Sequence, residues 1–147
     1  VMGTQQILMI VLSVIIVGIA VAVGITMFQN QAKNSNRQAV IADLNNFAAM
    51  AEAFYKVPAS MGGGGNGNPG FLNSNDELSY YLGFSAADTT SNGNGVYKLS
   101  GFGARTVTIT GTGTEIGNDD KNKLSAKIVL TADGTTGKIT KVLTQTN

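Results

Sequence analysis

The chain of 147 residues contains no cysteine, no histidine and no tryptophan, and it has only two prolines. Without cysteine there are neither disulfides nor thiolate chemistry, and without histidine the commonest general base and the imidazole metal ligand are missing. Charged residues are scarce as well, at 13% against about a quarter in typical domains. We therefore expect a protein that is not an enzyme, with no catalytic residue and no cofactor.

The charge balance also limits the partners of the chain. Ten Lys and Arg residues against nine Asp and Glu residues give a formal net charge of +1. Binding to nucleic acid through phosphate neutralisation needs a much larger basic excess. We expect no nucleic-acid partner.

The first segment of the chain, residues 1–32, has no ionisable side chain. Within it, residues 7–28 form an apolar run that only two glycines, a serine and a threonine interrupt. As a helix this run would span roughly 33 Å, which matches a hydrocarbon core of about 30 Å. A secretory signal peptide has a shorter apolar region behind basic residues. The run therefore predicts a helix that can lie in a membrane.

Residues 33–57 contain neither glycine nor proline, and their apolar side chains recur every three or four positions. This spacing predicts an amphipathic continuation of the first helix, in which Glu52 and Lys56 form a favourable pair four residues apart. Pro58 is expected to end the helix. The side chains expected to pack on the rest of the chain are Val40, Leu44, Phe47, Ala48, Ala51, Phe54 and Tyr55.

The composition changes to Gly, Asn, Ser and Thr over residues 58–95, which we expect to form a variable loop. Its part at 61–70 is rich in glycine and reads as a flexible connection. A short capped helix is expected near 75–82, with its tyrosines covering the apolar stripe of the long helix.

Apolar and polar residues alternate over much of residues 96–147, which predicts an antiparallel sheet of three or four strands. A hairpin loop at 132–137 is expected to join the last two strands. Such a sheet needs the apolar face of the helix as a cover. The expected inward side chains are Val107, Ile109, Leu124, Ala126, Ile128 and Leu130. The last strand offers Ile139, Val142 and Leu143, and the sequence leaves its register open. The expected fold class is α+β, a long N-terminal helix packed on a C-terminal antiparallel sheet.

This organisation resembles type IV pilins and the related pseudopilins. The specific part of the resemblance is residues 1–57, above all the uncharged helix that begins almost at the first residue. Most bacterial members start with an N-methylated phenylalanine and have glutamate at the fifth position, whereas this chain has Val1 and Gln5. Many also have proline near position 22, where this chain has Ala22. These departures indicate an atypical branch, similar to archaeal-type pilins, which often lack the glutamate.

The resemblance implies a major pilin that polymerises through its N-terminal helix into an extracellular helical filament of many copies. Before assembly the subunit would be inserted in the cytoplasmic (inner) membrane, after a prepilin peptidase has removed a leader in front of Val1. Pilus assembly machinery would then build the filament on the cell surface. Adhesion, motility, DNA uptake and electron transfer are all compatible tasks of such a fibre.

The residues expected to take part in assembly are Val1, Gln5, Gln6, Gly18, Ala20, Ala22, Gly24 and Phe28. Two pairs of small residues, Gly18 with Ala22 and Ala20 with Gly24, are four positions apart and would let helices approach closely. Small residues are also common in apolar helices that make no such contact.

Two other functions stay open at this point. A pseudopilin of a type II secretion-like machine would use the same helix in a short piston, and a single-pass membrane-anchored binding protein would not polymerise. We expect no metal site. Asp119 and Asp120 are weak calcium candidates, and turn chemistry explains them better.

Overall fold

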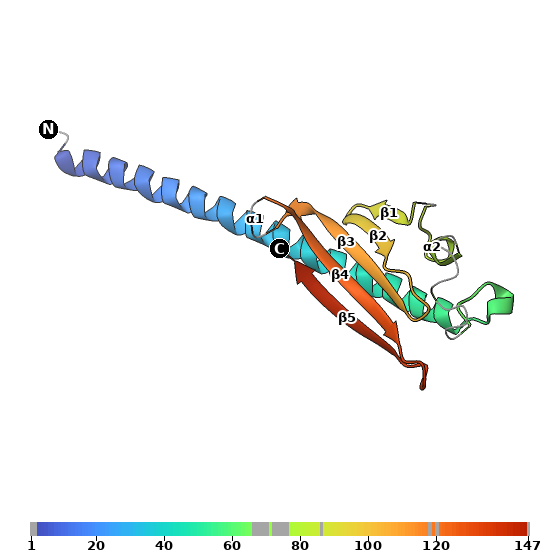
Figure 1. The fold of residues 1–147 in the computed structure, drawn as a ribbon. Helices are drawn as coiled ribbons and strands as arrows, with labels where there is room; N and C mark the ends of the chain where they lie inside the picture. Colours follow the sequence, from blue (N-terminus) through green and yellow to red (C-terminus); the bar gives the residue numbers. More distant parts are fainter. Residues whose placement is uncertain are drawn as a thin grey trace.

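The computed structural model describes residues 3–65, 71, 77–85, 87–117, 119 and 121–146. Within these residues one long helix, α1, runs along the whole molecule, and a five-stranded antiparallel sheet packs on its C-terminal half (Figure 1). The expected α+β fold class is confirmed. The elements are α1 (Thr4–Lys56), the 3-10 turn η1 (Ala59–Met61), α2 (Glu77–Tyr81), β1 (Thr89–Asn92), β2 (Gly95–Ser100), β3 (Thr106–Ile116), β4 (Lys123–Ala132) and β5 (Ile139–Thr146).

Helix α1 has 53 residues and is therefore about 80 Å long. It continues without a break past Ala22, where many bacterial pilins have proline. Its last helical residue is Lys56, because Val57 precedes Pro58 and is extended, with φ −70° and ψ 134°. The apolar first half and the amphipathic second half are thus parts of one rod.

The glycine-rich segment after η1 closes the end of α1, in contrast to the free connection that we expected. The backbone N–H of Gly64 donates to the carbonyl of Phe54 at 2.9 Å, and that carbonyl lies in the last turn of α1, where helices leave carbonyls unpaired. Gly63 and Gly64 are buried, and a side chain at Gly63 would begin 2.4 Å from the side chain of Val57. Glycine is needed here because the chain folds back onto the helix end.

The sheet follows the order β1-β2-β3-β4-β5, and every neighbouring pair is antiparallel. The sheet has five strands where the sequence predicts three or four, because residues 89–92, which the composition assigns to the variable loop, form strand β1. It is polar throughout and shows no apolar alternation, so only its pairing with β2 identifies it. The expected loop residues 66–70 and 72–76 lie outside the described part of the chain.

The core of the molecule lies between α1 and the inner face of the sheet. Phe47 is half buried, and its ring lies 5.0 Å from that of Phe84 and 5.1 Å from that of Tyr97. The other helix residues expected to pack on the sheet are all buried: Val40, Leu44, Ala48, Ala51, Phe54 and Tyr55. From the sheet, the expected inward residues Val107, Ile109, Leu124, Ala126, Ile128 and Leu130 are buried.

Of the two tyrosines of α2, only Tyr81 reaches the apolar stripe of α1. Leu78 and Leu82 are buried, while Tyr80 is exposed. The two leucines are four residues apart and share one helix face, which leaves Tyr80 on the other. Tyr81 is also exposed, although its ring still lies 5.5 Å from that of Phe54.

The structure fixes the register of the last strand, which the sequence leaves open, and Ile139 packs against the core. Val142 and Leu143 are exposed, and Ile139 is only half buried. Helix α1 lies over β3 and β4, so the edge strand β5 reaches beyond its cover. Alternation in the sequence cannot reveal how wide a sheet one helix covers.

Candidate functional site

The largest uncovered surface belongs to the first half of α1. Residues 4–31, which we call the arm, are all exposed and extend beyond the remaining residues, which we call the head (Figure 1). Sixteen large apolar side chains between Ile7 and Phe28 are each at least 50% exposed. By length and composition this helix can cross a membrane. Soluble monomers seldom expose apolar patches of more than a few hundred Å², so the arm needs a cover from outside the chain.

The polar groups of the arm are satisfied within the helix itself. The hydroxyl of Ser13 donates to the carbonyl of Met9 at 2.7 Å, and the hydroxyl of Thr26 donates to the carbonyl of Ala22 at 3.1 Å. From Leu8 onward the backbone N–H groups of the arm are paired within the helix, with carbonyls four residues earlier. The hydroxyls of residues 7–28 therefore stay hydrogen-bonded when water is removed. A lipid core and a dry protein interior both require this.

The small residues expected to act in assembly are open to the outside. A side chain added at Gly18 or Gly24 would meet no atom within 4 Å. Ala20 and Gly24 also line a shallow hollow in the arm, between the larger side chains of Ile16, Ile19, Val23 and Met27. A hollow between ridges is the shape into which a second helix packs.

The N-terminal end of the arm carries two exposed amides, Gln5 and Gln6. The first turn contains no acidic residue, and the backbone N–H of Gln6 donates to the carbonyl of Gly3 at 3.0 Å. Val1 lies outside the described residues. The amides are therefore hydrogen-bonding groups that a neighbouring chain can reach.

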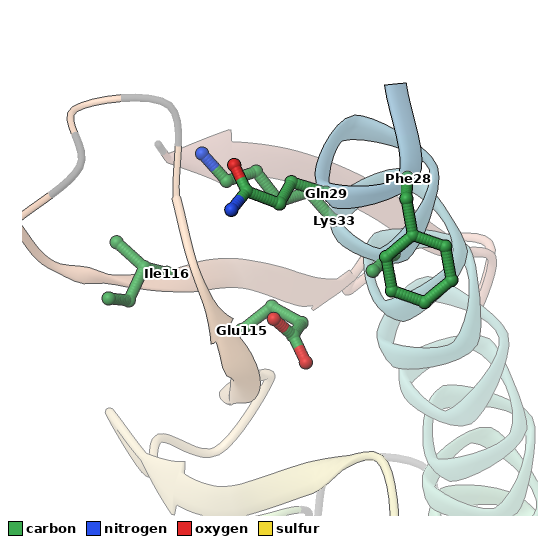
Figure 2. A pocket seen from close by; sticks show the side chains of 6 residues that line it. Phe28, Gln29, Lys33, Glu115 and Ile116 are labelled. Carbon is green, nitrogen blue, oxygen red and sulfur yellow. The ribbon is translucent and has the colours of Figure 1, made fainter. Parts of the chain in front are cut away.

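A hollow of about 390 Å³, which we call the notch, lies where the arm enters the head. Gln29 and Lys33 extend from α1 toward the end of β3, where Glu115 and Ile116 lie (Figure 2). Phe28 lies on the helix at the border of the notch and is 77% exposed. The notch combines apolar walls with one cation and one anion. It continues directly into the apolar surface of the arm.

One carboxylate joins the head to the helix. Oδ2 of Asp43 accepts hydrogen bonds from Nδ2 of Asn92 at 2.8 Å, from Nδ2 of Asn94 at 2.9 Å and from the hydroxyl of Tyr97 at 2.6 Å. Burial raises the pKa of Asp43, but these three hydrogen bonds together outweigh burial, so the pKa lies below its usual value. Burial and the nearby Asp43 charge raise the pKa of Tyr97. The turn between β1 and β2 is thereby fixed on α1.

A second junction lies about two helical turns closer to the arm, at Asn36. Nδ2 of Asn36 donates to the carbonyl of Asn94 at 2.8 Å, while Oδ1 accepts from the backbone N–H of Thr114 at 3.1 Å. The register of β3 against β4 shifts between Thr112 and Ile116, so this strand end lacks regular pairing. Asn36 therefore holds the part of β3 that borders the notch.

The edge strand β5 is tied to the helix by an ion pair. Nζ of Lys141 lies 2.9 Å from Oε2 of Glu52, and Nζ of Lys56 lies 3.4 Å from Oε1 of the same carboxylate. The hydrogen bond from Lys141 is the largest effect on the pKa of Glu52, which lies below its usual value. The Glu52–Lys56 pair expected from the sequence is thus part of a three-residue network.

Of the two weak calcium candidates, Asp119 is described by the structure, and its side chain stabilises a turn. Oδ1 of Asp119 accepts from the backbone N–H of Asn122 at 3.0 Å and from that of Lys121 at 3.2 Å, and these bonds lower its pKa. Asp120 lies outside the described residues. Among the residues that the structure describes, no group of three or more acidic, His or Cys residues is arranged to hold a metal ion.

Sequence reasoning missed the two junction residues and the notch. Asn36 and Asp43 stand off the apolar stripe of the helix and look like ordinary solvent-facing residues. The partners of each lie more than 45 positions further along the chain, so only the tertiary structure reveals them. The notch likewise joins residues 28–33 to residues 115–116.

Comparison of the chain with protein-family models, with curated proteins and with solved structures gives no match. The resemblance to type IV pilins therefore receives no support from known relatives. It depends on the sequence pattern of residues 1–57.

Proposed function

We propose that this chain is the structural subunit of an extracellular helical filament of the type IV pilus kind, and that the arm is its polymerisation element. The observation that carries the proposal is the arm: residues 4–31 form one helix that is apolar, uncharged and fully exposed. Burying a Val, Leu, Ile, Phe or Met side chain fully contributes about 1.5–3 kcal/mol. With sixteen such side chains uncovered, the free energy available for association is large.

The same arm suits two successive environments. In the first, the subunit is inserted in the cytoplasmic (inner) membrane, with residues 7–28 in the hydrocarbon core. In the second, the assembly machinery moves the subunit out of the lipid, and arms of many copies cover one another along the fibre axis. Both environments exclude water, and the internal hydrogen bonds of Ser13 and Thr26 make the arm compatible with either.

An exposed arm at one end of the molecule and a folded head at the other favour an open assembly. A contact between two different surfaces of identical subunits repeats without closing, unless its rotation happens to form a ring. The small residues Gly18, Ala20, Ala22 and Gly24 allow arms to approach closely. Catalysis and cofactors have no part in this proposal.

A charge placed in the arm tests the proposal. We expect Val17→Arg to abolish fibre formation, because the charge would be buried without a partner between packed arms. Membrane insertion should only weaken, since an arginine at the centre of a membrane-spanning helix costs about 2.5–3.5 kcal/mol on insertion scales and many apolar side chains oppose it. Val142→Arg is the matched control, since Val17 is 61% exposed in the arm and Val142 is 54% exposed on the head. The readouts are membrane fractionation and electron microscopy of material sheared from cells that carry a pilus assembly system.

The outcome also separates the alternatives. Long fibres from the unaltered chain and from Val142→Arg, but not from Val17→Arg, support the filament subunit. Membrane-bound monomers without fibres would contradict it and favour an anchored binding protein. Short periplasmic assemblies that never reach the cell surface would favour a pseudopilin.

A further inference from the structure

We propose that the notch at the base of the head receives the far end of the head of the next copy, so that heads stack head to tail along the fibre. This contact rests on the proposed filament function and adds a second interface to that of the arms. The occupant is a second copy of this chain. Three features of the molecule support this contact: the apolar side chains at the notch and at the far end of the head, the distance between these two places, and the face of α1 that stacking would cover.

The notch is built to receive an apolar group with a polar tip. Its walls include the exposed side chains of Phe28 and Ile116, which are 77% and 47% exposed. Lys33 and Glu115 add one positive and one negative charge, so the notch as a whole favours an uncharged occupant. A volume of about 390 Å³ accommodates a side chain of the size of Tyr or Met.

The far end of the head presents side chains of this kind. Met61 follows the C-terminal end of α1 and is 77% exposed, and Tyr80 on α2 is 68% exposed. Both elements lie at the end of the head opposite the arm (Figure 1). Methionine adapts its shape to irregular apolar hollows, and the tyrosine hydroxyl can donate a hydrogen bond to a carboxylate such as Glu115.

The separation of the two ends excludes a contact within one chain. From Ala32 at the notch to its last residue, Lys56, helix α1 advances about 36 Å, and η1 with Met61 follows at that end. If the notch contacts a far end, that far end therefore belongs to another copy, which is shifted by about this distance along the direction of α1. Because the contact joins two different surfaces, it repeats from copy to copy and gives an open stack.

The arm fits the same offset. Its 28 residues span about 42 Å, so the arm of one copy would lie beside residues 32–56 of α1 in the copy below. On the face of α1 that points away from the sheet, Ala42, Asn46, Ala49 and Ala53 are exposed, small or polar, and uncharged. Their spacing of four, three and four residues forms one stripe along which an apolar helix can pack. Stacking of the heads and covering of the arm thus require the same arrangement.

The chain has no cysteine, so engineered cysteines test the contact without background. We would prepare fibres of the full-length double variants Ile116→Cys with Tyr80→Cys and Ile116→Cys with Met61→Cys, and treat them with a short bismaleimide. The matched control is Ile116→Cys with Val142→Cys, because Val142 is exposed but lies on the edge strand β5. A ladder of covalent oligomers on a denaturing gel measures links between copies.

We expect at least one notch pair to give on the order of tenfold more ladder than the control pair, since a contact raises the local concentration of its groups. Fibres of normal yield without a ladder from either notch pair would overturn the stacking and leave the filament function intact. An equal ladder from the control pair would overturn it too. If the unaltered chain forms no fibre, both the stacking and the filament function fail.

Discussion

Asp43 shows how a single residue fixes the head on the helix. Its carboxylate accepts three hydrogen bonds from the β1–β2 turn and from Tyr97, whose side chain is fully buried. The bonds from Asn94 and Tyr97 are partly buried, whereas the bond from Asn92 is exposed. Removing the acceptor of a buried donor costs about 1–3 kcal/mol, and less where water can replace it. The position of the β1–β2 turn therefore depends on this one carboxylate.

We expect Asp43→Asn to destabilise the head by about 1–3 kcal/mol at neutral pH, because an amide accepts these bonds less well. The effect depends on pH. The folded pKa of Asp43 lies below its unfolded value near 3.9, so its contribution is present above that value and is lost as the pH falls through the folded pKa. Thermal unfolding in detergent at several pH values, followed by near-ultraviolet circular dichroism of the tyrosines, measures the loss of stability and its dependence on pH.

The control for this comparison is Glu115→Gln, which removes an exposed carboxylate that carries no such network and should change stability by less than about 0.5 kcal/mol. The stability difference between the unaltered chain and Asp43→Asn should shrink below about pH 4. A difference that stays constant down to pH 2 would show that the carboxylate charge is not what holds the turn.

Gly113 is a second residue whose role appears only in the tertiary structure. A side chain there would begin 2.2 Å from Oδ1 of Asn36, which accepts from the backbone of β3. We expect Gly113→Ala to displace this amide and to lower the free energy of unfolding by about 1–3 kcal/mol. Gly93→Ala, where the added carbon meets nothing within 4 Å, should change it by less than about 0.5 kcal/mol in the same assay. Equal effects of the two changes would contradict a close approach of helix and strand.

At the scale of elements, α1 does two separate jobs along one rod. Its second half is part of the core of the head, and the residues of its first half, up to residue 31, are all exposed. The division follows from the sequence, because charged residues begin at Lys33 and the apolar stripe begins at Val40. The sheet explains why the stripe exists, since β3 and β4 lie directly on it.

We expect Gly24→Ile to reduce fibre yield about tenfold or more, because the new side chain fills the hollow lined by Ala20 and Gly24 and removes more than about 1.4 kcal/mol of packing. Membrane insertion should be unchanged, since isoleucine is more apolar than glycine and meets nothing within the chain. Quantitative blotting of the sheared fraction measures the fibre yield, and blotting of the membrane fraction measures how much of the chain is inserted. Val21→Ile, which enlarges an exposed side chain outside the hollow, serves as the control. If both variants assemble equally well, close helix approach at Gly24 is not needed.

The elements differ in how far the sequence could predict them. The helix boundary at Pro58 and the inward faces of β3 and β4 follow from local chemistry and strict alternation, and the structure has them as expected. Strand β1 has no apolar residue and β5 is left uncovered, so local pattern could not predict the first or orient the second. The residues of the arm could be proposed from the absence of charge alone. The junctions at Asn36 and Asp43 could not, because each joins segments that are far apart in the sequence.

At the scale of the whole molecule, arm and head are separable. No residue before Val40 belongs to the core cluster of the head. We expect a chain that lacks residues 1–28 to be folded and monomeric in water without detergent, with the tyrosine circular dichroism of the full chain, and to form no fibres. Analytical ultracentrifugation of this variant checks the expectation. Aggregation or loss of the tyrosine signal would show that the arm is needed to fold the head.

The central claim is that arms of many copies cover one another at the axis of a fibre. The most direct measurement is electron cryomicroscopy of material sheared from cells, with helical reconstruction at a resolution that identifies side chains. We expect continuous fibres in which residues 4–31 form a central bundle of helices and the heads lie outside. Fibres with the arm on the surface, or a chain found only as membrane-bound monomers, would contradict it.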